Sequence, residues 1–192
     1  MRTLCAVIDV ERARDLAAEH LAAALPRRWR HVQGVAARAG EVAARLAEGD
    51  GTLVSAAWLH DIGYAPGVKD TGLHSLDGAR YLRRTGVDEV IVDLVAYHSC
   101  ASVEAAERGL DGDLLAQFPP GDPVLTDALC YCDMTTSPDG EPVDARDRLA
   151  EIKARYGRGD VVTRSIERAA PEILAAVART RERLAVAQRQ AM

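Results

Sequence analysis

The chain has 192 residues, of which 48% are hydrophobic and 28% charged, and its formal net charge is -5. This length and composition predict one globular domain, and the acidic balance, with arginines scattered among acidic residues, argues against a nucleic-acid polymer as partner. No apolar stretch approaches the ~20 residues of a membrane span, and four cysteines without disulfide-like spacing fit a reducing compartment, so we expect a cytoplasmic protein.

The first half of the chain predicts a series of helices. Asp9 can cap a helix that extends to about Leu25, where Pro26 interrupts it. A second helix, over about 28–47, carries apolar residues at a spacing of three to four. Further helices are predicted over 52–59, 73–84 and 88–97.

The second half begins with a polar segment, 109–123, that contains glycine and proline. We expect a loop there, which either covers a site or simply connects two helices. Helices are predicted over 126–133, over about 144–156 and from 160 onward, with Pro171 as a break or a new start. No alternating strand pattern is present. The sequence therefore predicts an all-α fold in which residues 1–192 form one compact helical bundle.

Four of the five histidines form an ordered pattern with two aspartates. His60 and Asp61 are adjacent, inside the segment Trp-Leu-His-Asp-Ile-Gly, and both can ligate one metal ion. His20 stands outside the pattern, and we expect it to be an ordinary packed or solvated side chain. The ordered set is His31, His60, Asp61, His74, His98 and Asp133.

This order, His…His-Asp…His…His…Asp, resembles that of the HD-domain metal-dependent phosphohydrolases, over about Arg30 to Asp139. The resemblance implies an HD domain with its core at about 28–139 and with N- and C-terminal helices packed on it. In the family pattern, one metal ion is held by the first His, the His-Asp pair and the last Asp, and a second by the two remaining histidines. The first set corresponds to His31, His60, Asp61 and Asp133, the second to His74 and His98, with Asp61 bridging.

Imidazole nitrogens and carboxylate oxygens without thiolates suit Fe, Mn, Co, Ni or Zn. We therefore expect one or two divalent transition-metal ions as cofactor. The resemblance implies hydrolysis of a small phosphorylated substrate by a metal-activated water, with nucleotides and dinucleotides among the candidates. Asp61, His74 and His98 are the expected catalytic residues, because the two histidines either bind a second metal ion or contact substrate phosphate beside a single one.

Residues beside the pattern suggest supporting roles. Arg30 and Lys69 flank it and could hold the phosphate of a substrate. Ser99, which follows a histidine of the set, is a candidate hydrogen-bond donor to a ligand side chain. Gly78, one turn after His74, is expected to permit close helix packing.

Two other functions fit the same residues. The set also resembles that of the HD-domain mixed-valent diiron oxygenases, and a non-catalytic HD module could bind metal or nucleotide and regulate a partner. Tyr64 stands where some mononuclear HD nucleotidases have a catalytic glutamate, and the interval between Asp61 and His74 is short. No substrate name is therefore transferred, and self-association into a homo-oligomer is left open.

Overall fold

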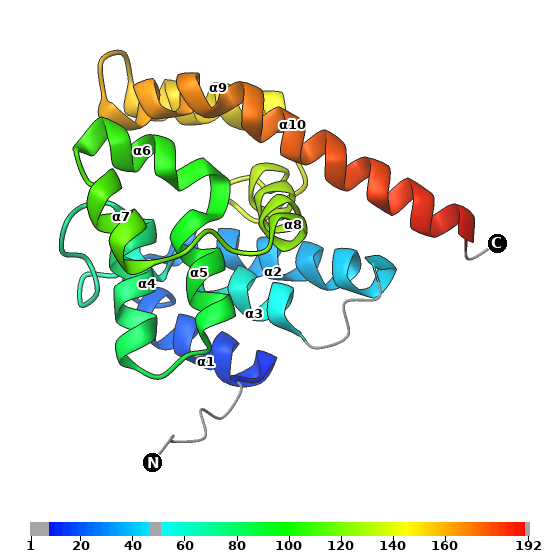
Figure 1. Cartoon of the computed structure of the whole chain (residues 1–192), viewed down its shortest axis with the longest axis horizontal. Helices are drawn as coiled ribbons and strands as arrows, with labels where there is room; N and C mark the ends of the chain where they lie inside the picture. Colours follow the sequence, from blue (N-terminus) through cyan, green and yellow to red (C-terminus); the bar gives the residue numbers. More distant parts are fainter. Residues whose placement is uncertain (1–7, 47–50, 191–192) are drawn as a thin grey trace.

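The computed structural model describes residues 8–46 and 51–190, which contain α-helices and two short 3₁₀ helices but no β-strand (Figure 1). The predicted all-α fold is confirmed. None of the described helices has the length and apolar character to cross a membrane. In chain order the helices are α1 (Val10–Leu21), α2 (Pro26–Leu46), α3 (Thr52–Leu59), η1 (Ile62–Tyr64), α4 (His74–Arg84), α5 (Glu89–Tyr97), η2 (His98–Cys100), α6 (Ala101–Arg108), α7 (Asp111–Gln117), α8 (Pro123–Met134), α9 (Ala145–Tyr156) and α10 (Val161–Gln190).

Helix starts follow from local chemistry. The carboxylate of Asp9 accepts a hydrogen bond from the backbone N–H of Arg12 at 2.8 Å, so it caps α1 as expected. Pro26 is the first residue of α2, a position where its missing N–H costs no hydrogen bond, and α2 therefore begins two residues earlier than about Arg28. Asp122 and Asp144 cap α8 and α9 in the same way as Asp9.

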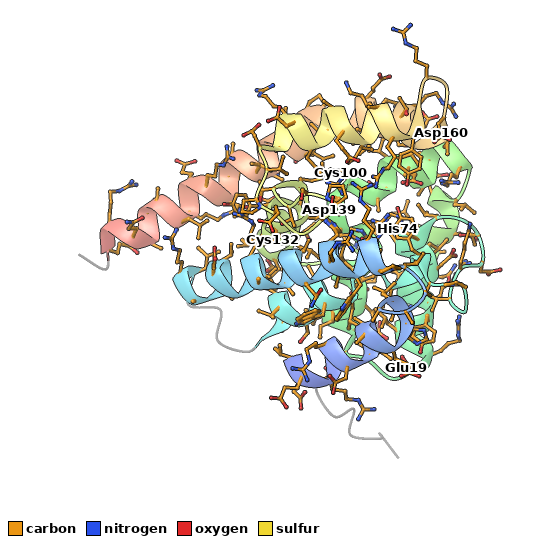
Figure 2. All side chains as sticks on the ribbon, turned by 180° about the vertical axis from the view of Figure 1, so that it is seen from behind. Glu19, His74, Cys100, Cys132, Asp139 and Asp160 are labelled. Atoms are coloured by element: carbon orange, nitrogen blue, oxygen red, sulfur yellow. The ribbon has the colours of Figure 1, made fainter. Side chains whose placement is uncertain are left out.

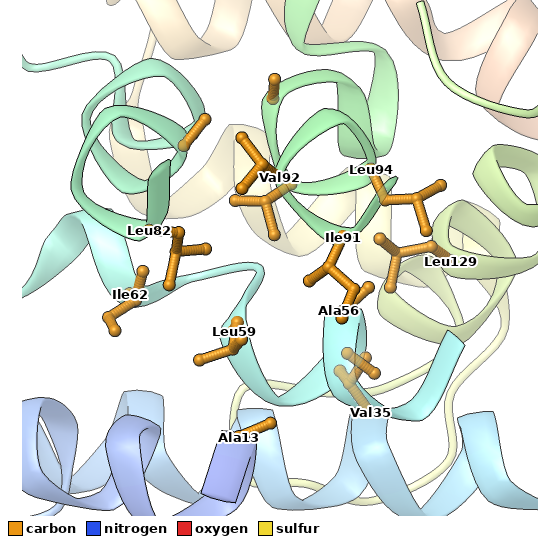
Figure 3. Close-up of a cluster of buried hydrophobic side chains, with 14 of the residues drawn as sticks. Ala13, Val35, Ala56, Leu59, Ile62, Leu82, Ile91, Val92, Leu94 and Leu129 are labelled. Atoms are coloured by element: carbon orange, nitrogen blue, oxygen red, sulfur yellow. The ribbon is translucent and has the colours of Figure 1, made fainter. Parts of the chain in front are cut away.

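A large apolar core joins α2, α3, α5 and α8 (Figure 3). Val35, Leu59, Ile91 and Leu129 are among its members, each with 2% or less of its surface exposed. Burial of a side chain of this size contributes about 1.5–3 kcal/mol to stability. Because α3 is packed within this core, the residues that directly follow Leu59 are held in the interior.

A second apolar cluster lies on the other side of α8, against α9 and α10. Met134 on α8, Ile152 on α9, and Ile173 and Val177 on α10 are buried in it. In Figure 1, α9 and α10 accordingly lie across one end of the bundle, with α8 between them and α2. The C-terminal end of α8 therefore lies where the two clusters meet.

The segment 109–123 differs from the loop expected there. It contains α7, whose Leu114 is 1% exposed, and the following Phe118 is also 1% exposed. Leu114 lies on α7, and Phe118 follows the helix with an extended backbone; burial of these two side chains outweighs the polar composition around them. The prediction of a loop across the whole segment was wrong.

The helix α10 continues through Pro171, so the expected break is absent. A proline inside a helix removes one backbone hydrogen bond and costs about 3 kcal/mol. Ala169, Ile173, Ala176 and Val177 are all buried around it, and α10 packs against α6, α8 and α9. Tertiary packing on neighbouring helices therefore outweighs the local preference for a break.

Two glycines bring the backbone of α2 against the turn that follows α8. A Cβ atom added at Gly34 would lie 2.3 Å from the carbonyl oxygen of Gly140. Gly140 has a φ of 90°, and a Cβ there would lie 2.6 Å from the carbonyl oxygen of Arg30. Both positions therefore require glycine, and the contact fixes the residues after Asp133 against α2.

We expect Gly34→Ala to lower the free energy of unfolding by about 1–3 kcal/mol, because the new methyl group meets backbone that must shift. Gly40 lies in the same helix and serves as the matched control, because a Cβ atom added there would meet open space. Gly40→Ala should instead raise the free energy of unfolding by about 0.5–1 kcal/mol. Urea denaturation checks both values. Equal effects at the two positions would contradict the close backbone contact.

Candidate metal centre

All six residues of the histidine–aspartate pattern meet in the interior. Most are delivered by helix ends: His60 caps the C-terminus of α3, His74 is the first residue of α4, and His98 begins η2 directly after α5. His31 lies in the second turn of α2, and Asp133 near the end of α8. Figure 2 shows His74 in the middle of the molecule, among side chains between α2 and the α9–α10 pair.

The six side chains form two groups of potential ligands. One contains His31, His60 and Asp133, the other Asp61, His74 and His98, and within each group the ligand atoms lie within 4.8 Å of one another. Asp61 also faces the first group. Its Oδ2 lies 3.3 Å from Nε2 of His60, whereas its Oδ1 lies 3.6 Å from Nε2 of His74. The two oxygens of one carboxylate are thus directed at different groups.

Backbone carbonyls fix the orientation of three imidazole rings. Nδ1 of His60 donates to the carbonyl of Ala57 at 2.7 Å, and Nδ1 of His98 donates to the carbonyl of Val95 at 2.6 Å. Both carbonyls belong to the last turn of a helix, where they lack helical partners. Nδ1 of His31 lies 3.0 Å from the carbonyl of Ser137. When the proton is on Nδ1, Nε2 keeps a free lone pair. Neutral histidine binds metal through such a lone pair.

The Nε2 atom of His60 has no hydrogen-bond partner, although its residue is fully buried. A buried polar atom without a partner costs about 1–3 kcal/mol. In the second group, Nε2 of His74 and Nε2 of His98 are 3.1 Å apart, so the two ring nitrogens lie close enough to face one ion. A cation would satisfy all these atoms together, so the residues present fit a metal ion.

The electrostatics of the pocket set the protonation states of its potential ligands. Burial alone would raise the pKa of Asp61, but the Arg28 guanidinium and His60 outweigh it and hold that pKa well below its usual range. Burial, reinforced by the neighbouring His98 ring, lowers the pKa of His74 well below its ordinary value. Carboxylates stay ionised and this imidazole stays neutral at pH 7, which are the protonation states that metal ligands need.

Burial and the neighbouring His60 also lower the pKa of His98. For His60 itself, burial opposes the charged form, but the adjacent Asp61 carboxylate outweighs it and raises the pKa. The negative potential that favours a proton on His60 favours a metal cation at the same place.

Ser99 holds the carboxylate of Asp133. Its hydroxyl donates to Oδ2 of Asp133 at 2.5 Å, while Oδ1 lies 3.0 Å from Nε2 of His31. Ser99 and Cys100 have φ values of 49° and 60°, an unusual backbone conformation for residues other than glycine. Such strain persists where the surroundings enforce it, frequently at functional sites. Here it directs the Ser99 side chain at Asp133.

Gly63 explains the glycine of the His-Asp-Ile-Gly segment. A Cβ atom there would lie 1.9 Å from the carbonyl oxygen of His74, so only glycine lets the start of α4 approach η1 this closely. Gly78 supports the same contact, because a Cβ there would lie 3.2 Å from the backbone nitrogen of Gly63. The close packing expected at Gly78 is therefore present, and it places His74 beside Asp61.

The carboxylate of Asp77 holds the segment that leads into His74. It accepts hydrogen bonds from the backbone N–H groups of Asp70, Thr71 and Gly72, at 2.9–3.1 Å, and from the Thr71 hydroxyl at 2.7 Å. Asp77 is only 1% exposed. The residues directly before α4 are thus tied to α4 itself.

The structure places Arg28, and not Arg30, at the ligand groups. Nη1 of Arg28 donates to Oδ2 of Asp61 at 2.7 Å, and the guanidinium lies 3.9 Å from the ring centre of Tyr64. Arg30 instead pairs with Asp139 at 2.9 Å, where both side chains are half exposed. Arg28 precedes His31 by three residues and so shares its helical face, a signal available in the sequence. Lys69 lines a neighbouring cavity together with His74.

A cavity opens onto the ligand groups from the direction of α9 and α10. Asp61, His74, His98 and Asp133 form its polar end, with Arg28 beside them. Apolar side chains also line it, among them Met134, Ile152, Val162, Ile166 and Ala169. Arg148 and Arg155 of α9 also line it, and neither lies within the histidine–aspartate pattern.

Comparison with known proteins agrees with this geometry. The family model described as HD domain matches residues 28–154, which is more than half of the chain. Searches of curated proteins and of solved structures returned no match. The matched range contains all six potential ligands together with Arg28 and Arg148. The chain belongs to the HD-domain family.

Proposed function

We propose that this protein hydrolyses a small phosphate ester at a centre of two divalent transition-metal ions. The HD-domain family consists in general of metal-dependent hydrolases, and this chain has the His and Asp groups that could hold metal. The observation that carries the proposal is the placement of Asp61, whose two oxygens face two different groups of imidazole nitrogens. A carboxylate so placed suits a bridging ligand.

In this proposal His31, His60 and Asp133 would hold one ion, His74 and His98 would hold the other, and Asp61 would contact both. Divalent cations bound there would polarise a phosphoryl oxygen and activate the attacking water. The backbone carbonyls behind His31, His60 and His98 keep the Nε2 lone pairs directed at the centre. The hydrogen bond from Ser99 keeps the Asp133 carboxylate in place.

Arg28 is the residue best placed to bind the reacting phosphoryl group. Its guanidinium lines the cavity beside Asp61 and is held by the face of the Tyr64 ring. A planar guanidinium with several donors matches phosphoryl oxygens and counters the negative charge that develops during transfer. The apolar side chains that α9 and α10 contribute to the cavity would accept the organic part of the ester and exclude water from it.

Asp61→Ala should abolish most metal binding, because it removes the carboxylate that faces both groups. His74→Ala and His98→Ala should each reduce the content to about one ion per chain. Elemental analysis after reconstitution with Mn, Fe, Co, Ni or Zn measures this directly. His20→Ala is the control, because His20 bonds to the Tyr81 hydroxyl at 2.7 Å, outside both groups. Unchanged metal content with reduced turnover at His74 and His98 would make these residues substrate contacts beside one ion.

The purified protein should release phosphate from members of a phosphoester panel without oxygen, since hydrolysis consumes only water. An anaerobic phosphate assay with reconstituted metal checks the reaction class. The same ligands occur in diiron oxygenases, so an iron-loaded sample should be tested in parallel for oxygen uptake. Oxygen uptake coupled to loss of an organic substrate, without phosphate release, would overturn hydrolysis. Metal binding without either reaction would point to a regulatory module.

Arg28→Gln should lower kcat/KM by about tenfold or more, because it removes a buried charge beside the reacting phosphoryl group. Arg30→Gln makes the same change two residues away on α2, at a half-exposed side chain paired with Asp139. We expect the smaller loss at Arg30. Steady-state kinetics, with metal content measured for both variants, decide between them. A larger loss at Arg30 would assign the phosphate to that residue, as the sequence suggested.

A further inference from the structure

A second cavity adjoins the catalytic one, and its polar wall is formed mainly by arginine. It lies between the start of α2, α9 and the turn after α8. Arg27, Arg28, Arg148 and Arg155 line it together with His31, and no acidic residue is among its described lining residues. A recess with this lining attracts an anion.

Three of these arginines connect the two cavities. Arg28, Arg148 and Arg155 line the cavity at the ligand groups and the second cavity as well. Their guanidinium groups therefore form a common wall. A substrate that places one end at Asp61 could extend along this wall without leaving contact with positive charge.

Arg148 has unmet hydrogen-bonding capacity inside this wall. Its residue is 3% exposed, and its buried Nε–H has no hydrogen-bond partner. Nη1 donates to Glu151 at 2.5 Å, so the guanidinium is fixed in place. Arginine stays charged when buried, and a buried donor without an acceptor is costly. An anionic ligand that reaches this Nε–H would supply that acceptor.

The charges around the wall leave a positive surplus. Glu151 serves both Arg148, at 2.5 Å, and Arg155, at 3.6 Å. One carboxylate is thus shared by two guanidinium groups of α9. Arg27 at the rim likewise shares Asp139 with Arg30. Arg28 is already paired with Asp61, so it is on the α9 side, at Arg148 and Arg155, that the balance favours one further negative charge.

We propose that the second cavity is a subsite for a second anionic group of the substrate, either a phosphoryl or a carboxylate group. The substrate then carries two anionic groups, one at the ligand groups and one at Arg148 and Arg155. The inference rests on the proposed function, since it assigns the first anionic group to the reacting phosphate. It narrows the substrate class from phosphate esters in general to bis-anionic ones.

Calorimetric titration of the 192-residue chain with its metal bound tests the subsite without turnover. The probes are propylphosphonate, propane-1,3-bisphosphonate and 4-phosphonobutyrate, which differ in the absence or the kind of a second anionic group. We expect at least one of the two bis-anionic probes to bind about tenfold more tightly than propylphosphonate. The preferred probe distinguishes a phosphoryl from a carboxylate subsite.

Arg155→Gln should remove most of this preference, measured in each protein as the ratio of the affinities for the bis-anionic probe and for propylphosphonate. Arg146→Gln is the matched control, because Arg146 is an exposed arginine of the same helix that lines neither cavity. Arg146→Gln should keep the preference. Arg148→Lys retains the charge but loses the planar fork, so it should reduce the preference by several-fold.

Three results would overturn the subsite: no preference in the unaltered protein, a preference that Arg155→Gln retains, or equal losses in Arg155→Gln and Arg146→Gln. If the second anionic group of the probe bound the metal and not the subsite, the preference would be retained in Arg155→Gln. Failure of the proposed hydrolysis is distinguishable, because a preference that is lost in Arg155→Gln supports the subsite even if no ester is cleaved. Hydrolysis without any preference would overturn the subsite alone.

Discussion

The carboxylate of Asp61 is the group on which the arrangement of the site depends. Placing a carboxylate in a protein interior costs several kcal/mol unless charges and donors compensate it. Arg28 supplies a hydrogen bond at 2.7 Å, and the imidazoles of His60 and His74 approach from two sides. These partners come from α2, α3 and α4. Because all three partners must reach one buried carboxylate, the first turn of α2, the end of α3 and the start of α4 are held close together.

The orientation of the histidines also depends on groups at helix ends. Helix ends leave carbonyl groups without helical partners, and α3 and α5 each use one such carbonyl to hold an imidazole three residues later. The ring proton satisfies the backbone, and the opposite nitrogen is turned to the centre. Ligand orientation is thus a consequence of where the helices end, more than of side-chain packing around the rings.

The ligand set could be predicted from the sequence because the order of its histidines and aspartates resembles that of the HD-domain phosphohydrolases. All six predicted ligands meet in space, whereas their assignment to two ions stays a prediction. The sequence suggests Arg30 because it adjoins His31, but adjacent residues point about 100° apart on a helix, and Arg28 shares the face of His31.

Other features depend on distant contacts that no local pattern encodes. The helix α7 forms around Leu114 and Phe118, whose burial needs neighbouring helices, and Pro171 is tolerated because α10 packs on its own neighbours. Arg148 reaches the cavity from α9, outside the histidine–aspartate pattern, and only the packing of α9 reveals it.

The loop between η1 and α4 is held at both ends, by Gly63 against the His74 carbonyl and by Asp77 against the residues before α4. Its tip at Pro66 and Gly67 is exposed, and a side chain at Gly67 would meet open space. Movement or lengthening of the tip is therefore not transmitted to His74. For engineering, the tip is a place to insert a short peptide tag or a reporter beside the centre while its ligands keep their positions.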